Sequence, residues 1–280
     1  MLRKTSELAP PQPRGTFSER ALGILEPRQA LKMLVAALAV LGALHMLSVV
    51  VMNIWGQVGF FNGLVMKLNL DAERAIPSHY SSILLMLAAG LLYVVSRMDR
   101  PEMRRFWRLM TGVFVFLSFD EAASLHEMLV YPLNSRFELA RQILFSWVLI
   151  LVPMVAVLFV YSIRYLFKMP RRMQKLVVAS GFIFVVGMLV FELLAGLYIG
   201  SGGSQNGYLY GLMVLCEESA EIFGVSLFIY SLLVYVDLIA RTEEAQPTSS
   251  PSAACPPTSA PSPSAATRKE TASSSPMVTS

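Results

Sequence analysis

Long apolar runs separated by short polar segments dominate the chain between about residue 30 and residue 240. A helix needs about 20 apolar residues to cross the hydrocarbon core of a bilayer, and six runs approach this length. The pattern therefore predicts an all-α fold, a polytopic integral membrane bundle of six transmembrane helices. The expected spans are Ala30–Val51, Tyr80–Ser96, Phe106–Leu129, Ile143–Ile163, Leu176–Ile199 and Tyr208–Val236.

The composition supports a membrane protein. Of the 280 residues, 55% are hydrophobic and only 15% are charged, whereas soluble domains carry about 25% charged residues. The two cysteines, Cys216 and Cys255, lie far apart, which excludes a disulfide framework. The chain has a formal net charge of +4, but its bases cluster in short loops beside the apolar runs. They indicate membrane topology, and we expect no nucleic-acid partner.

The distribution of basic residues predicts the orientation. Most of the 23 Lys and Arg residues lie before the first span, in the second and fourth connections, or in the C-terminal tail. The positive-inside rule then places both termini in the cytoplasm, as an even number of spans also requires. We expect a bacterial inner-membrane protein with three parts. These are a basic leader (1–29), the transmembrane domain (30–240) and a Pro/Ser/Ala-rich tail (241–280) expected to be disordered.

One external connection is itself apolar. The segment Asn53–Pro77 carries Trp55, Phe60, Phe61, Leu64 and Val65. It is expected either to lie along the membrane interface as a short amphipathic helix or to pack on the bundle as an ordinary lid.

Acidic residues inside the expected spans are the feature that points to function. A charged side chain at the bilayer centre costs about 2.5–3.5 kcal/mol, and no Lys or Arg lies deep in any span. A proton, water or a bound cation must therefore compensate these carboxylates. The acidic residues are Asp120, Glu121 and Glu127 in the third span, Glu192 in the fifth, and Glu217, Glu218 and Glu221 in the sixth.

Helix periodicity gathers several of these groups. Asp120, Ser124 and Glu127 are expected on one face of the third helix, and Glu217 and Glu221 on one face of the sixth. The topology places the acids in the outer half of the membrane. The three histidines of the chain, His45, His79 and His126, are expected at a similar height. His45 alone is more typical of an interhelical hydrogen-bonding partner than of a metal ligand.

Carboxylates and imidazoles on facing helices form metal sites in helix bundles. One hypothesis is therefore a divalent metal held by His126, Glu127, Glu218 and Glu221. Asp120, Glu121 and Glu217 would then be the catalytic acids and bases. The alternative is a set of protonated carboxyls that only hydrogen-bond between helices.

Three segments resemble a family of uncharacterised bacterial multi-pass membrane proteins. They are AIPSHYSSILLMLAAGLLYVVSR, FLSFDEAASLHEML and EESAEIFGVSLFIYSLL. The resemblance covers about Asp71 to Asp237 and rests on a DE-x4-HE element followed by a late EE-x2-E element. It implies a shared architecture and shared acidic positions, and it implies no particular reaction.

Three functions remain open from the sequence, which does not decide whether the protein is an enzyme. The first is a metal-dependent hydrolase or transferase acting on membrane lipid or a lipid-like substrate. The second is a proton- or cation-coupled transporter, since intramembrane acids serve as ion relays. The third is a regulator that senses a membrane signal or sequesters a cytoplasmic protein partner through its termini.

Overall fold

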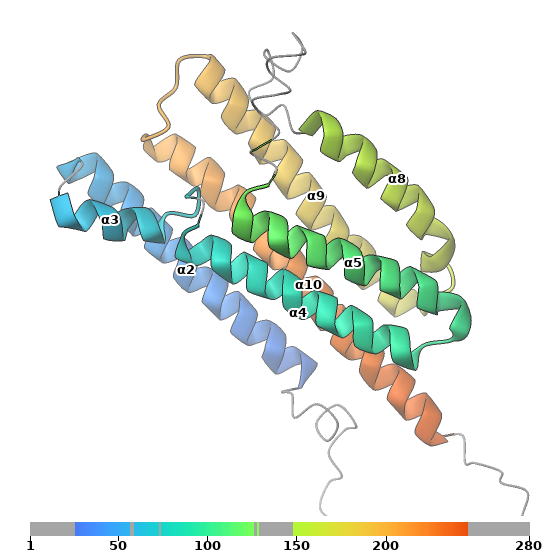
Figure 1. The fold of residues 1–280 in the computed structure, drawn as a ribbon. Helices are drawn as coiled ribbons and strands as arrows, with labels where there is room; N and C mark the ends of the chain where they lie inside the picture. The colour runs from blue at the N-terminus through green and yellow to red at the C-terminus, as the bar shows by residue number, and fades with distance from the viewer. Residues whose placement is uncertain (1–25, 57–58, 73, 126–127, 129–147, 246–280) are drawn as a thin grey trace, which may run out of the picture. The chain divides into compact units, whose positions relative to one another are not determined.

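The computed structural model describes residues 26–56, 59–72, 74–125, 128 and 148–245. These residues form seven α-helices and no strand, which confirms the expected all-α class. Figure 1 shows their order along the chain. The helices are α2 (Pro27–Trp55), α3 (Gly59–Leu68), α4 (Ile76–Met98), α5 (Pro101–Ala123), α8 (Val148–Leu166), α9 (Arg171–Gly200) and α10 (Tyr208–Ala245).

Four of these helices, α2, α4, α9 and α10, are long and apolar enough to cross a membrane. They correspond to the first, second, fifth and sixth expected spans. Helix α5 has a comparable length but carries several charged residues, and α8 contributes a shorter apolar segment, Val152–Leu166. Helix α3 lies within the apolar connection, which agrees with the expectation of a short helix there.

The expected end of the third span is wrong. Helix α5 ends at Ala123, and Ser124 adopts a left-handed conformation with φ of 55°. Its N–H donates to the carbonyl of Asp120 at 2.7 Å, which closes the last turn of the helix. Helix α5 therefore ends before Ser124, which does not share a helical face with Asp120. Glu127 and Leu129 lie outside the described residues, so the expected position of Glu127 stays a prediction.

Prolines define where several helices begin. Pro27 and Pro101 are the first residues of α2 and α5, and Pro77 lies in the first turn of α4. Proline suits these positions because the first N–H groups of a helix have no intrahelical acceptor. Pro170 is the residue immediately before α9. The two resulting tight connections, 98–101 and 166–171, lie at one end of the molecule, hereafter the basic end.

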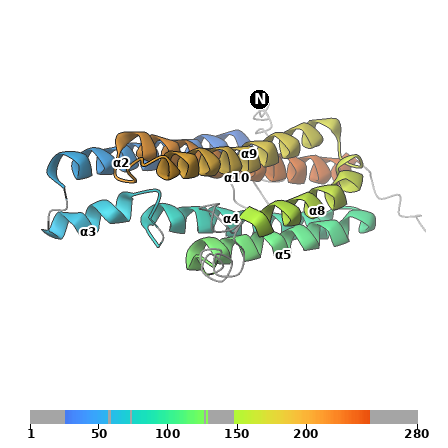
Figure 2. The same cartoon turned by 90° about the horizontal axis from the view of Figure 1, so that it is seen from above.

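Helix α10 is the centre of the packing, because it contacts α2, α4 and α9 (Figure 2). Its residues Ile222, Ile229 and Leu232 are almost completely buried. Helices α4 and α5 pack against each other as an antiparallel pair. There Ser82 and Ser118 each donate a hydrogen bond from Oγ to the other's carbonyl at 2.8 Å. These reciprocal bonds fix the two helices in register.

Small residues bring α9 and α10 into close contact. A Cβ placed on Gly187 would overlap the Cβ of Ala220, and a Cβ on Gly224 would lie 3.0 Å from the carbonyl oxygen of Ser180. No larger side chain fits at either glycine without moving a helix. Such small-residue contacts are a principal means of helix association in membranes, where burial of apolar surface gives little driving force.

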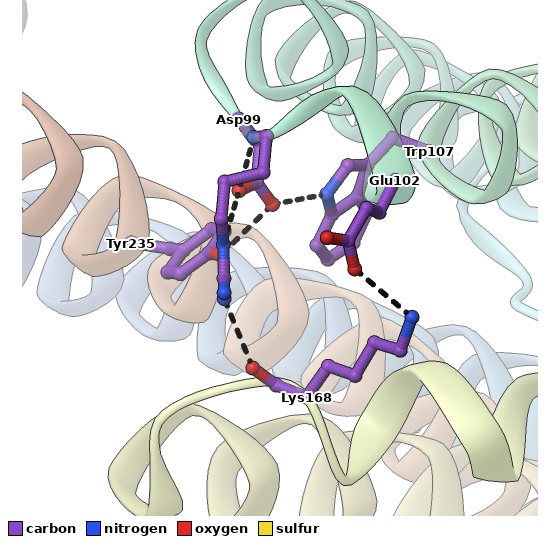
Figure 3. Close-up of polar contacts among 6 residues, drawn as sticks. Asp99, Glu102, Trp107, Lys168 and Tyr235 are labelled. Carbon is purple, nitrogen blue, oxygen red and sulfur yellow. Dashed lines mark hydrogen bonds and ion pairs between the residues drawn. The ribbon is translucent and has the colours of Figure 1, made fainter.

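A buried carboxylate joins three segments at the basic end (Figure 3). Only 4% of the Asp99 side chain is exposed. Its Oδ2 accepts the indole N–H of Trp107 at 2.6 Å and the hydroxyl of Tyr235 at 2.8 Å. Its Oδ1 accepts the backbone N–H of Arg100 at 2.7 Å. The three donors compensate for the loss of water around this charge.

The Asp99 cluster extends to the connection between α8 and α9. The guanidinium of Arg100 donates to the carbonyl of Lys168 at 3.2 Å, and the Lys168 ammonium lies 3.2 Å from Oε2 of Glu102 (Figure 3). The two tight connections and α10 are therefore held together by polar contacts at this end.

The close contact between α9 and α10 gives a test with a matched control. Gly187→Ala is expected to destabilise the protein by about 1–3 kcal/mol, because the new methyl group overlaps Ala220. Gly181→Ala makes the same change in the same helix, where an added Cβ meets no atom within 4 Å. It is expected to be neutral or slightly stabilising.

Thermal unfolding of the two purified variants in detergent measures this difference. Equal melting temperatures for both variants would show that the close contact does not limit the packing of these helices.

Candidate functional site

Two carboxyl groups meet between α9 and α10. Glu192 on α9 and Glu217 on α10 share a side-chain hydrogen bond, and the charges of Glu218 and Glu221 act on Glu217 as well. A carboxylate can only accept hydrogen bonds, so at least one member of the pair must carry a proton for the bond to exist. This arrangement is hereafter called the acid pair.

The small-residue contact explains why the acid pair forms. Glu192 follows Gly187 by five residues, and Glu217 precedes Ala220 by three. Because α9 and α10 run in opposite directions, both acids lie on the same side of the Gly187–Ala220 contact. The closely packed backbones bring carboxyl groups on adjacent turns within reach of each other.

The stretch of sequence around the acid pair contains no basic residue. Residues 176–240, which include most of α9 and α10, contain no Lys, Arg or His. The bases of these two helices, Arg171, Arg172, Lys175 and Arg241, therefore all lie at the basic end, several turns from the acid pair. The proton in the acid pair reduces the repulsion between the two carboxyl groups.

Further titratable groups extend from the acid pair toward the end of the molecule that lies opposite the basic end. The Tyr210 hydroxyl, in the first turn of α10, donates to Oδ1 of Asp71 at 3.1 Å. Tyr210 also interacts electrostatically with Glu217 and Glu192. Tyr210 and Glu217 are seven residues apart, which is about two helical turns, so they lie on one face of α10. The result is a row of polar groups from the connection after α3 to the acid pair.

Two aromatic pairs set the register of α5 against α10. Ring centroids are 5.8 Å apart for Trp107 with Tyr235 and 5.0 Å apart for Phe114 with Phe228. Seven residues from the second pair, away from the basic end, each helix carries an acid, Glu121 on α5 and Glu221 on α10. Because a spacing of seven keeps residues on one face of a helix, this register places Glu121 level with Glu221.

His45 is an interhelical connector, as the sequence suggested. It is 1% exposed, its Nδ1 accepts the backbone N–H of Leu70 at 3.1 Å, and its Nε2 lies 2.9 Å from the carbonyl oxygen of Gly211. The first contact requires an unprotonated Nδ1 and the second a protonated Nε2, which together define a neutral ring. His45 thus ties α2 to α10 and to the connection after α3. His79, by contrast, is exposed in the first turn of α4, with Nδ1 2.8 Å from the Ala75 carbonyl oxygen.

The expected metal site is only partly within the described structure. Asp120 and Glu121 lie in the last turn of α5 and are half-buried, whereas His126 and Glu127 lie outside the described residues. Among the residues that the structure does describe, no three His, Cys, Asp or Glu side chains are grouped so as to hold a metal ion. The metal ligands His126, Glu127, Glu218 and Glu221 therefore remain a sequence-based prediction.

Sequence reasoning left three important side chains out of the expected site. Glu192 is isolated in an apolar stretch, yet it contacts Glu217 directly. Tyr210 has the sequence position of an ordinary interfacial aromatic residue, and Asp71 that of a loop acid. The only signal that could have identified Glu192 was its expected height, which matches that of Glu217.

Comparison with known proteins gives one match. Residues 33–236 match a family model described as a domain of unknown function (DUF8692). No curated protein and no solved structure matches the chain. The matched range includes α4, α5, α8 and α9, most of α2 and the acid-bearing part of α10.

The double role of His45 predicts a large effect of its loss. His45→Leu is expected to leave the Leu70 N–H and the Gly211 carbonyl without partners, at a cost of about 1–3 kcal/mol for each buried group. His79→Leu is the matched control, and its exposed ring should contribute far less. Thermal unfolding in detergent compares the two. Equal melting temperatures for His79→Leu and His45→Leu would mean that the two buried contacts of the His45 ring contribute no more than the exposed His79 ring does.

Proposed function

The chain belongs to the DUF8692 family, and we propose that it is a proton-coupled membrane carrier whose acid pair holds the coupling proton. The observation that supports this function is the hydrogen bond between Glu192 and Glu217, which lie in two helices long and apolar enough to cross a membrane. Ionisable groups at such positions are costly, and proteins use them as proton or ion relays.

The membrane arrangement in this proposal has six spans. Helices α5 and α8 would cross the bilayer beside the four apolar helices, with both termini in the cytoplasm of a bacterial cell. The distribution of bases supports this orientation, because the basic end would then face the cytoplasm. Helix α3 would lie along the outer interface, where an apolar ten-residue helix is favourable.

Proton loss from the acid pair supplies the coupling. When the proton leaves, two carboxylates remain in contact and repel each other. At a separation of about 4 Å and an effective dielectric constant of about 20, the repulsion is about 4 kcal/mol. Either the helices separate or a cation enters to relieve it. Both outcomes link the movement of a proton to a second event, which is the requirement for a coupled carrier.

The row of polar groups gives the proton a route. Asp71 and Tyr210 connect the acid pair to the outer surface in this orientation. Glu221, one turn below Glu217, continues the row toward the cytoplasm, level with Glu121. His126 and Glu127, which the hydrolase hypothesis needs, lie outside the described residues, as do residues 1–25 and 246–280 of the two termini. The contact between Glu192 and Glu217 supports the carrier.

Removal of the shared proton provides the test. In the full-length protein, infrared difference spectroscopy should detect a protonated carboxyl group that Glu217→Gln abolishes. In vesicles with an imposed membrane potential and an inward proton gradient, the wild type should take up protons. Glu217→Gln should lower that rate at least about tenfold, as expected for loss of a proton-transfer group.

Glu26→Gln is the matched control, since Glu26 is exposed before α2. Its proton uptake should equal that of the wild type. Wild-type uptake no faster than that of empty vesicles, with Na⁺, K⁺ or Mg²⁺ supplied as counter-ion, would contradict the proposal.

A further inference from the structure

Helices α5 and α8 meet at the basic end through stacked aromatic rings. The ring of Phe106 on α5 lies 4.7 Å from that of Tyr165 and 6.4 Å from that of Tyr161, both on α8. The two tyrosines are one turn apart, and their hydroxyl oxygens are separated by 3.3 Å. We refer to this contact of Phe106, Tyr161 and Tyr165 as the aromatic seam.

Basic side chains surround the aromatic seam. The guanidinium carbon of Arg164 lies 4.6 Å from the ring centroid of Tyr161 and 4.8 Å from that of Tyr165. The Lys168 ammonium is 6.0 Å from the Tyr165 ring. Arg105 is exposed and three residues from Glu102, the partner of Lys168, so it lies on the side of α5 that faces α8.

Arg164 has positive charge to offer a ligand. Its side chain is exposed, and its position over two rings restricts the orientation of the guanidinium. Within the described part of the chain, the ion pairs at this end use Arg100, Lys168 and Arg241, but not Arg164. A guanidinium held on an exposed side chain is suited to a phosphate, which it can bind through two parallel hydrogen bonds.

Apolar side chains continue from the bases toward the other end of both helices. On α8, Val160 and Val157 precede Arg164 by four and seven residues, and they are 69% and 71% exposed. On α5, Leu109 and Phe116 follow Arg105 by four and eleven residues and are also exposed. Each helix thus has a base at the basic end and exposed apolar residues on the same face beyond it.

We propose that the aromatic seam binds one anionic phospholipid. Arg164 holds the headgroup phosphate, Lys168 and Arg105 add positive charge, and the Tyr161 and Tyr165 hydroxyls supply hydrogen bonds. The acyl chains lie along the exposed apolar residues of α5 and α8. These apolar residues favour a lipid over a soluble phosphate, and the number of bases favours an anionic over a zwitterionic headgroup. This site is independent of proton transfer.

Native mass spectrometry of the full-length protein tests the site. Released from detergent, the wild type should retain phosphatidylglycerol in preference to phosphatidylcholine with the same acyl chains. Arg164→Gln should weaken phosphatidylglycerol binding about tenfold, as expected for loss of a charge-assisted phosphate contact. Arg172→Gln is the matched control, because Arg172 is an exposed base in the first turn of α9. It should change binding by less than about twofold, the effect of screened surface charge.

Two further variants keep the test decisive. Arg164→Lys retains the charge but not the two-pronged donor, so its binding should fall between those of the wild type and Arg164→Gln. Arg105→Gln removes a base to which no ring contact is assigned, and it should also weaken phosphatidylglycerol binding. It provides the test if Arg164→Gln does not purify as a folded protein. Soluble glycerol 3-phosphate should not displace the lipid.

Several results would overturn the proposal. Equal losses for Arg164→Gln and Arg172→Gln would indicate diffuse surface attraction without a defined site. Equal retention of phosphatidylcholine would remove the role of the headgroup charge. Displacement of the lipid by glycerol 3-phosphate would assign the site to a soluble phosphate.

Discussion

The close contact between α9 and α10 is the constraint on which the site depends. Gly187, Ala220 and Gly224 permit the two backbones to approach until a single added methyl group would overlap a neighbour. At that separation, carboxyl groups on adjacent turns of the two helices meet, because the residues at the contact are too small to hold the backbones apart. The cost of placing two acids together in a membrane is offset by the shared proton and by van der Waals packing along the helices.

Polar contacts at both ends of α10 stabilise this packing. His45 holds the beginning of the helix through the Gly211 carbonyl, and Asp99 holds its later part through Tyr235. Each of these buried groups has its hydrogen-bonding capacity largely satisfied by partners from different segments. Removing any partner would leave a buried polar group uncompensated, so both clusters favour one arrangement of the helices. Glu217, the member of the acid pair on α10, lies between these two contacts.

The sequence predicted the helices well because apolar length and proline position are local signals. The positions of α2, α4, α9 and α10 followed from hydrophobic runs, and the interhelical role of His45 followed from its isolation in such a run. The end of α5 was missed because a left-handed Ser124 has no strong signature in the sequence. Periodicity alone continues a helix through Ser124 to Leu129.

Contacts between helices were harder to predict, since they depend on how each helix is rotated about its axis. Glu192 has no sequence signal that links it to the site, because it is a single acid in an apolar run and its partner is 25 positions away. Asp99 sits among arginines in a short connection, where it resembles part of a topology signal. Its burial follows from the neighbouring Trp107 and from Tyr235 on a distant helix, and neither relationship can be read from spacing along the chain.

The tight fit of Gly187 also has a meaning for how the family diverges. A relative that acquires a bulkier residue at this position must shift a whole helix or reduce the volume opposite, at Ala220. The two sites should consequently drift as a unit across homologous sequences, and lineages in which they change should also lose the acids at positions 192 and 217. The close contact at Gly187 thereby links sequence changes in the packing between α9 and α10 to changes in the acid pair beside it.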